Sequence, residues 1–219
     1  MSTHHVSPSD GHVLDSLLAA YAAGSLPPAM HALLGAHLEL NATNQKFVSD
    51  LEVSLARTVD AACDRPARNR ESRLDAIFGS EQLAQEQFAA CDAPELPRAL
   101  RRFLGRDLNE LSFKTVLPGI REHRVDIGDG SVAVLYRIRA GRKMPQHTHE
   151  GSEVSLVIRG GFSDATGHFV RGDVAVTDEH VDHVPVADAD EECVCFAVID
   201  APLRLTGPIG RIFNRFIRH

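Results

Sequence analysis

The chain contains no tryptophan and only two tyrosines among its 219 residues, and it has four cysteines. A long hydrophobic segment is also missing: the one apolar run near the N-terminus, VLDSLLAAYAAG, contains Asp15 and has no basic leader. It therefore suits neither a signal peptide nor a membrane span. We expect a cytoplasmic protein that does not bind membranes, with its cysteines present as reduced thiols rather than as a disulfide framework.

Positive charge is scarce as well. The 23 lysines and arginines are outnumbered by 30 acidic residues, and the net charge is −7. Because no broad basic surface can form to offset phosphate repulsion, direct binding of nucleic acid is not expected. The apolar fraction of 43% and the charged fraction of 24% are those of an ordinary globular protein.

Residues 1 to about 90 show apolar spacing typical of helices. Ser9 or Asp10 can cap a first helix that ends at Gly24, and Pro27 and Pro28 suit the first turn of a second helix. The residues that form an apolar stripe are Val13, Leu14, Leu17, Leu18 and Tyr21 in the first helix, and Met30, Leu33, Leu34, His37 and Leu38 in the second. A third helix is predicted at about 43–63. Its apolar stripe, which we expect to be buried, consists of Phe47, Leu51, Leu55 and Val59. Helices this short cannot bury a large core, so we expect a partner to cover part of it.

A change of pattern separates this half from a β-rich half. The stretch 64–73, which includes RPARNRESR, is polar and broken by proline and is predicted to be a flexible linker, followed by a short apolar helix, LDAIFGS. Residues 81–105 look helical and connective, and strands begin near Phe113, with a hairpin whose turn is Gly128-Asp129-Gly130. The predicted organisation is a helical domain over 1–85, a connector over 86–108, a β-rich domain over 109–204 and an amphipathic helix over 205–219.

The last of these segments ends in GPIGRIFNRFIRH, with apolar residues on one helical face and arginines elsewhere. A basic amphipathic tail binds a membrane surface or a partner in some proteins and packs on its own domain in others. We predict that this one packs on its own domain.

The most informative stretch is GRKMPQHTHEGSEVSLVIRG, residues 141–160. His147 and His149 are two residues apart, so on a strand both side chains leave the same face, and Glu153 follows after a turn at Gly151. His183 is the best downstream candidate for a fourth ligand. Imidazoles with a carboxylate suit zinc, iron, manganese or nickel better than calcium or magnesium, with zinc favoured. The alternative is that these histidines are exposed strand residues that bind no metal.

The spacing of these ligands and of the glycines around them resembles the cupin superfamily. Gly141, the His-x-His pair, the glutamate and Gly160 match the first cupin motif without a gap. Gly172 and His183 keep the length of the second motif, although its inner proline and glycine are replaced. The resemblance implies a single metal-binding cupin β-barrel of the jelly-roll type, with a homodimer formed through the barrel as in many cupins.

A helical domain followed by one cupin resembles the ChrR-type anti-sigma factors over nearly the whole chain. In that family the helical domain binds zinc through an early histidine and a His-x3-Cys-x2-Cys motif. Here His12 and His37 match the histidines, whereas Asn41 and Asn44 stand at the cysteine positions. Amide oxygens bind zinc weakly, so we predict that this degenerate site is empty. His37 is then expected to be hydrogen-bonded near Asn41, or Asn44 to cap the third helix.

The resemblance implies an α+β two-domain fold, with an anti-sigma-like bundle of three to four helices before the cupin. It also implies that the helical domain sequesters an extracytoplasmic-function sigma factor and that the cupin senses oxidants such as singlet oxygen. The family has a late Cys-x-Cys pair, matched here by Cys193 and Cys195. These are either small buried apolar residues or an oxidisable pair near the metal.

The alternative class of protein is an enzyme. Cupins with three histidines and one glutamate include metal-dependent dioxygenases, and an open coordination position allows that chemistry. The helical domain would then be vestigial. No cluster of substrate-orienting residues stands out, so we favour the regulator, for which no catalytic residue is expected. His123, His168 and His180 have no predicted role, although His180 is close enough to His183 to substitute as a ligand.

Overall fold

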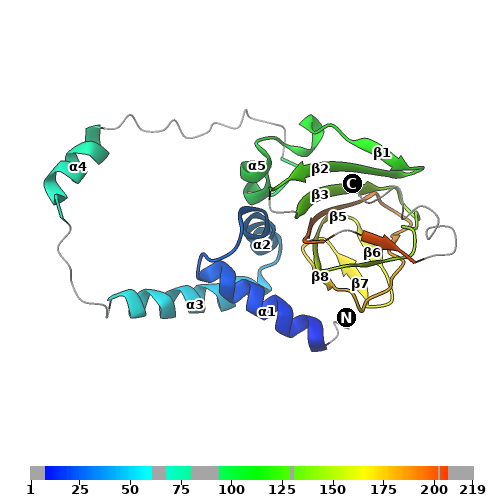
Figure 1. Cartoon of the computed structure of the whole chain (residues 1–219), viewed down its shortest axis with the longest axis horizontal. Helices are drawn as coiled ribbons and strands as arrows, with labels where there is room; N and C mark the ends of the chain where they lie inside the picture. The colour runs from blue at the N-terminus through cyan, green and yellow to red at the C-terminus, as the bar shows by residue number, and fades with distance from the viewer. Residues whose placement is uncertain (1–7, 61–67, 80–93, 129–130, 202, 207–219) are drawn as a thin grey trace.

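The computed structural model describes residues 8–60, 68–79, 94–128, 131–201 and 203–206. Its helices are α1 (Pro8–Ala22), α2 (Pro28–Leu40), α3 (Thr43–Asp60), α4 (Arg70–Gly79) and α5 (Arg98–Leu104), followed by a 3₁₀ turn at Leu108–Glu110. Helices and antiparallel sheets occupy separate parts of the chain, so the fold is α+β (Figure 1). No helix within the described ranges is both long and apolar enough to span a membrane.

The ends of the first two helices follow the local chemistry of the chain. Gly24, just after α1, has φ +65°, a conformation that glycine adopts at little cost. Pro27 precedes α2, and Pro28 is its first residue. A backbone N–H at that position has no acceptor within the helix, so proline loses no hydrogen bond there. The predicted cap at Ser9 or Asp10 is wrong, because α1 already begins at Pro8.

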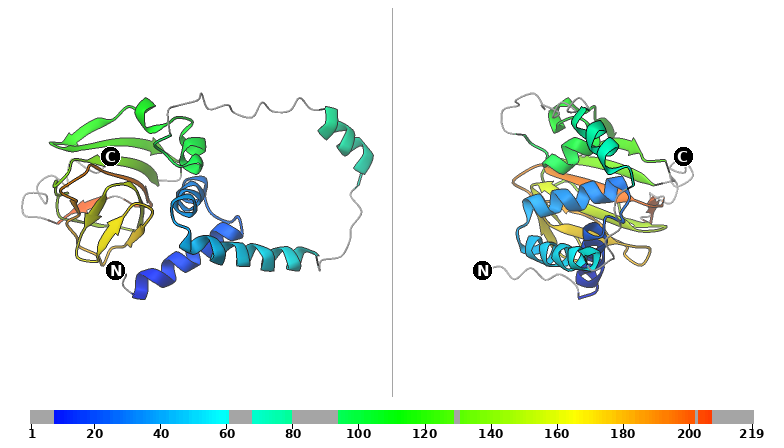
Figure 2. Two further views of the ribbon diagram at one scale, coloured as in Figure 1. Left: turned by 180° about the vertical axis from the view of Figure 1, so that it is seen from behind. Right: turned by 90° about the vertical axis from the view of Figure 1, so that its left-hand side faces the viewer.

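Helix α3 forms as predicted, but the predicted burial of its apolar stripe is wrong. Phe47, Leu55 and Val59 are 39%, 42% and 72% exposed, and Val48 is the buried apolar residue of this helix. Figure 1 and the left view of Figure 2 show why: α3 crosses α1 near its start and then extends away from the other described elements. Its spacing is helical, but no part of the described chain covers its second half.

The predicted linker at 64–73 is partly wrong. Residues 64–67 lie outside the described residues, but Arg70 to Arg73 form the first turn of α4, which continues through the predicted LDAIFGS helix. No residue of α4 is buried, and Ile77 and Phe78 are 64% and 83% exposed. Within the predicted connector α5 is helical, whereas 80–93 lie outside the described residues. The predicted helix 205–219 is wrong at its start, because Leu205 is the last residue of a strand, and its residues from 207 onward lie outside the described residues.

The strands form a β-domain of three antiparallel sheets. The largest has the order β1-β2-β3-β10-β5-β8, the second β7-β6-β9 and the third β11-β4. The predicted hairpin is present, with Asp126 of β2 opposite Val132 of β3. The bounds are β1 (Lys114–Leu117), β2 (Ile120–Asp126), β3 (Val132–Ile138), β4 (His147–His149), β5 (Glu153–Arg159), β6 (Gly161–Ser163), β7 (His168–Val170), β8 (Val174–Thr177), β9 (Val186–Ala187), β10 (Cys193–Ile199) and β11 (Leu203–Leu205).

Helices and sheet share one hydrophobic core. Helix α2 is buried continuously from Ala32 to His37, whereas His31 and Glu39 at its two ends are exposed. Strand β10 is buried at every residue because both faces of its sheet are covered. The shared core contains the fully buried Leu18, Leu33, Leu34 and Leu100 from the helices and Leu135, Leu156 and Phe196 from the sheet. The inner face of the same sheet, which carries Cys193 and Cys195, packs on Phe162 and Phe169.

Candidate metal centre

Three histidines meet inside the β-domain. His147 and His149 leave one face of β4, as their spacing predicts, and His183 comes from the segment after β8. The main chains of His147 and His183 are bonded in both directions, at 3.1 and 3.0 Å, which holds the two rings opposite each other. The three side chains are buried, and each offers a nitrogen within 4.8 Å of the others.

The hydrogen bonds of His147 and His183 assign their tautomers. His147 donates its Nδ1–H to the carbonyl oxygen of Pro145 at 2.7 Å, and His183 donates its Nδ1–H to the carboxylate of Asp164 at 2.7 Å. Both Nε2 atoms therefore carry lone pairs, and they lie 3.0 Å apart. Two lone pairs at this distance repel each other unless a cation lies between them.

Protonation of His147 does not relieve this contact at neutral pH. Burial, assisted by the neighbouring His183, lowers the pKa of His147 to about 4. The same two causes lower the pKa of His149 to about 4. Both rings are therefore neutral at pH 7, and neutral imidazole is the form that binds metal.

His149 provides independent evidence that this site fits a metal ion. Both of its ring nitrogens are buried, and neither has a hydrogen-bond partner among the described residues. Its Nδ1 is 3.6 Å from Oε2 of Glu153, too far for a hydrogen bond. Burying an unpaired polar atom costs about 1–3 kcal/mol, a cost that a coordinate bond to a metal would remove. The donors present thus fit a divalent metal ion.

Glu153 lies beside the three histidines but outside the group whose donor atoms are all within 4.8 Å of one another. It begins β5, is half-buried, and lines a cavity of about 40 Å³ together with His147 and His183. Its Oε1 accepts a hydrogen bond from Ser155 at 2.7 Å, which leaves Oε2 facing the imidazoles. Tyr136 lines the same cavity, and burial raises the pKa of its phenol, so that the phenol stays protonated.

Asp164 is a site residue that the sequence analysis missed. It lies between β6 and β7, where its carboxylate also accepts hydrogen bonds from the amide and hydroxyl groups of Thr166 at 2.8 and 2.6 Å. Burial alone would raise its pKa, but the bonds from His183 and Thr166 outweigh burial and hold it below the usual range. Asp164 is therefore a carboxylate that orients a ligand imidazole. Its only signal in the sequence is the turn Asp-Ala-Thr-Gly.

Cys193 and Cys195 are both buried on the inner face of β10, with their sulfur atoms 3.5 Å apart. Cys195 also lines the metal cavity. The hydrogen bond with Cys193 and burial raise the pKa of Cys195, which keeps it as an unreactive thiol. This geometry supports the packing interpretation, and a redox role of the pair stays a prediction.

The remaining histidines are not part of the centre. His180 is exposed beside Glu179 and does not take the place of His183. His168 pairs with Asp188, and His123 donates to the carbonyl oxygen of Ser112.

The residues of the degenerate zinc site do not fit a metal. His12 is exposed, and both ring nitrogens of the buried His37 are hydrogen-bonded. The partner of His37 is Asn44 and not Asn41, whose side chain instead accepts from the amide of Thr43 at 3.0 Å. The predicted cap is also wrong, because Asn44 lies inside α3. No zinc ligand set forms here among the described residues.

Fold and site together define a cupin-like metal-binding domain attached to a helical domain. Residues 104–201 match the family model of the ChrR Cupin-like domain. The chain is 31% identical to the anti-sigma-E factor ChrR of Cereibacter sphaeroides over 94% of its own length and 97% of the relative's. It belongs to the family of ChrR-type anti-sigma factors.

A solved structure agrees with this assignment. The crystal structure of Rhodobacter sphaeroides SigE in complex with the anti-sigma ChrR matches 90% of this chain and 99% of that chain, with a TM-score of 0.71 and 30% identity. The structure of KdgF from Halomonas sp. matches 42% of this chain and 89% of that chain, with a TM-score of 0.38 and 23% identity. The match to ChrR spans helices and sheets alike.

Asp164→Asn is expected to weaken metal binding about 10–100-fold, because an amide orients the His183 ring less firmly than a carboxylate does. The measurement is competition with a chromophoric chelator at pH 7. The matched control is Asp188→Asn, which alters an aspartate–histidine pair outside the centre and should leave the affinity unchanged. Equal affinities of the two variants would contradict the role of Asp164.

Proposed function

We propose that this protein binds an extracytoplasmic-function sigma factor through its helical domain, and that its β-domain is a single cupin barrel whose metal centre senses oxidants such as singlet oxygen. The observation that carries the first part is the exposure of apolar side chains on α3 and on α4, two helices joined through residues outside the described ranges. These side chains, together called the helical apolar surface, belong to Val53 (50% exposed), Leu55 (42%), Val59 (72%), Ile77 (64%) and Phe78 (83%).

Such a surface needs a partner. Isolated exposed apolar residues are normal, but a set that includes a phenylalanine and several branched residues on projecting helices is typical of a protein interface. The shared core of α1, α2, α5 and the sheet is already complete without it. The ChrR relative in the matched crystal structure is in complex with SigE, which supports a sigma factor as the partner here.

For the metal centre we propose zinc, held by His147, His149, Glu153 and His183. Imidazole and carboxylate donors are common zinc ligands, and a divalent ion would bring together three segments that are separate in sequence: β4, the start of β5 and the segment after β8. Singlet oxygen adds to electron-rich imidazole rings. Loss of one imidazole donor would release one of these segments, which makes the site suitable as a sensor.

The small cavity argues for regulation rather than catalysis. Pockets that hold organic substrates usually measure about 300–1,000 Å³. The space beside Glu153, His147 and His183 is about 40 Å³, enough for a metal ion with water-sized ligands. A dioxygenase substrate would not fit beside the metal without rearrangement of the β-domain.

Co-purification with the sigma factors of the same source tests the partner. We expect a one-to-one complex with one of them, and Phe78→Asp should weaken it at least about 10-fold in calorimetric titration, since a buried charge replaces an aromatic contact. The control is Val116→Asp on β1, which is 45% exposed but outside the helical apolar surface. Failure of every sigma factor to bind, or equal losses in both variants, would contradict the proposal.

The sensor role has its own test. His147→Ala is expected to retain inhibition of the sigma factor in a transcription assay but to lose the response to singlet oxygen, because the metal centre no longer forms. Metal content is measured in the same preparation, and wild-type protein is the control. If inhibition disappears together with the metal, the division of labour between the two domains is wrong.

A further inference from the structure

His37 joins three parts of the molecule. It lies in the last turns of α2, is 1% exposed, and donates its Nδ1–H to the carbonyl oxygen of Gly172 in the β-domain at 2.7 Å. Its Nε2 accepts a hydrogen bond from the amide of Asn44 in α3 at 2.9 Å. Both ring nitrogens are therefore used, and neither can bind zinc without breaking a buried hydrogen bond.

The protonation state of His37 agrees with this pairing. Burial lowers its pKa, outweighing the opposite effects of the Gly172 carbonyl and of Asp173. The ring is thus neutral at pH 7, with one donor and one acceptor. Each finds its complement, so no polar atom of the buried side chain is left unpaired.

Gly172 has a backbone conformation and a close neighbour that both favour glycine at this contact. Its φ of +93° strains any residue with a side chain, and a Cβ at this position would lie 3.3 Å from both Cβ and the carbonyl oxygen of Leu40. The main chain of Gly172 therefore lies directly against the end of α2. Its own amide donates to Val157 at 2.8 Å, which fixes it to β5.

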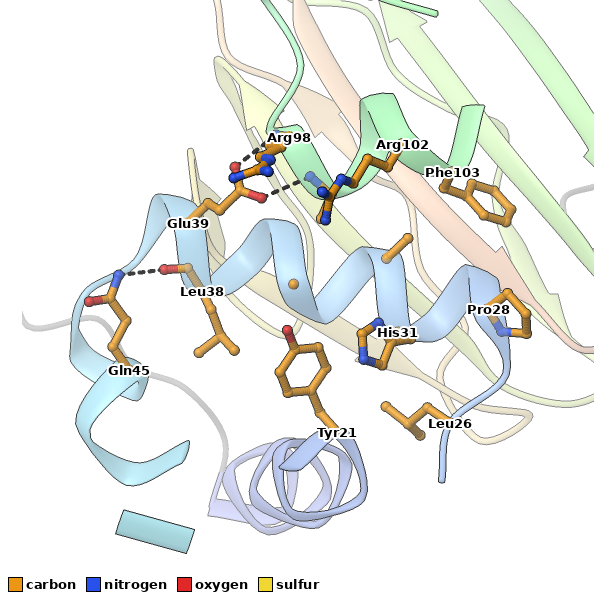
Figure 3. A pocket seen from close by; sticks show the side chains of 13 residues that line it. Tyr21, Leu26, Pro28, His31, Leu38, Glu39, Gln45, Arg98, Arg102 and Phe103 are labelled. Carbon is orange, nitrogen blue, oxygen red and sulfur yellow. Dashed lines mark hydrogen bonds between the residues drawn. The ribbon is translucent and has the colours of Figure 1, made fainter. Parts of the chain in front are cut away.

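A second contact secures the same end of α2. Figure 3 shows Glu39 turned toward the start of α5, where its two carboxylate oxygens accept hydrogen bonds from the amides of Arg98 and Ala99 at 2.7 and 2.8 Å. These amides have no partner inside α5, so Glu39 acts as its cap. We call the contacts of His37, Glu39 and Leu40 the α2 junction.

The α2 junction is continuous with the metal centre. Gly172 and Asp173 lead directly into β8, which is paired with β5 from Val174 opposite Leu156 to Thr177 opposite Glu153. Strand β8 thus begins just after Gly172, whose carbonyl oxygen is bonded to His37, and ends at Thr177, which lies opposite the candidate metal ligand Glu153. A rigid paired strand transmits a displacement of one end to the other.

We propose that the hydrogen bonds of His37 to Asn44 and Gly172 take the place of the helical-domain zinc in this chain and couple the metal centre to α2 through β8. This inference rests on the proposed metal site of the β-domain, but not on binding of a sigma factor. It makes Asn44, which stands where the family has a cysteine ligand, a functional replacement for that ligand. Because coupling is reciprocal, loss of the metal should loosen α2, and loss of the α2 junction should weaken metal binding.

The test is hydrogen exchange of the full chain, loaded with zinc and after chelation, together with metal analysis. We expect one zinc per chain, and chelation should raise exchange in α2 about 10-fold, the effect of losing roughly 1.4 kcal/mol of local stability. In Asn44→Ala, which leaves Nε2 of His37 unpaired, α2 should exchange faster already with zinc, chelation should add little, and zinc affinity should fall. Asn41→Ala, which loses only the bond to Thr43, should behave as wild type.

Three results would overturn the inference. Two zinc ions per wild-type chain would show that the helical domain still binds metal. An unchanged exchange rate of α2 after chelation, or the same behaviour of Asn44→Ala and Asn41→Ala, would remove the coupling. If Asn44→Ala does not fold, Asn44→Leu keeps the volume without the donor and should give the same loss. A chain without any zinc would instead refute the proposed metal site.

Discussion

The structure depends on the approach of the two Nε2 atoms of His147 and His183, 3.0 Å apart in a buried site. The opposite ring nitrogens are held by the carbonyl of Pro145 and the carboxylate of Asp164, so both lone pairs must point at each other. A metal cation bound by both lone pairs makes this arrangement favourable. The fold places these groups by bonding the main chains of two distant segments, and the metal would stabilise what the backbone already positions.

Helices α1, α2 and α5 pack directly on the large sheet of the β-domain. Helix α2 lies between α1, α5 and that sheet, and its end rests on Gly172. Strand β8, which follows Gly172 directly, is paired with β5 as far as Glu153. Meanwhile α3 and α4 keep their apolar side chains exposed. The end of the helical region at α2 therefore packs on the β-domain, whereas the second half of α3 is exposed and no residue of α4 is buried.

Much of this could be predicted from the sequence, because some patterns have few structural solutions. The His-x-His spacing and His183 identify the histidines of the candidate metal centre, and apolar spacing identifies α1, α2 and α3. Burial of α3 could not be predicted, since helical spacing shows which face is apolar but not what covers it. Asp164 and the bond from His37 to Gly172 were also out of reach: both join residues far apart in sequence, and no local pattern records such a contact.

X-ray absorption spectroscopy of the metal-loaded full chain tests whether the three histidines and Glu153 bind the metal. We expect a first shell of three imidazole nitrogens and one carboxylate oxygen at about 2.0–2.2 Å from the metal. We also expect that the imidazole scattering is reduced in His183→Ala. A shell containing sulfur at about 2.3 Å would place the metal on Cys195 instead. A shell of water oxygens alone would show that the lone pairs of His147 and His183 do not bind it, and would contradict the account.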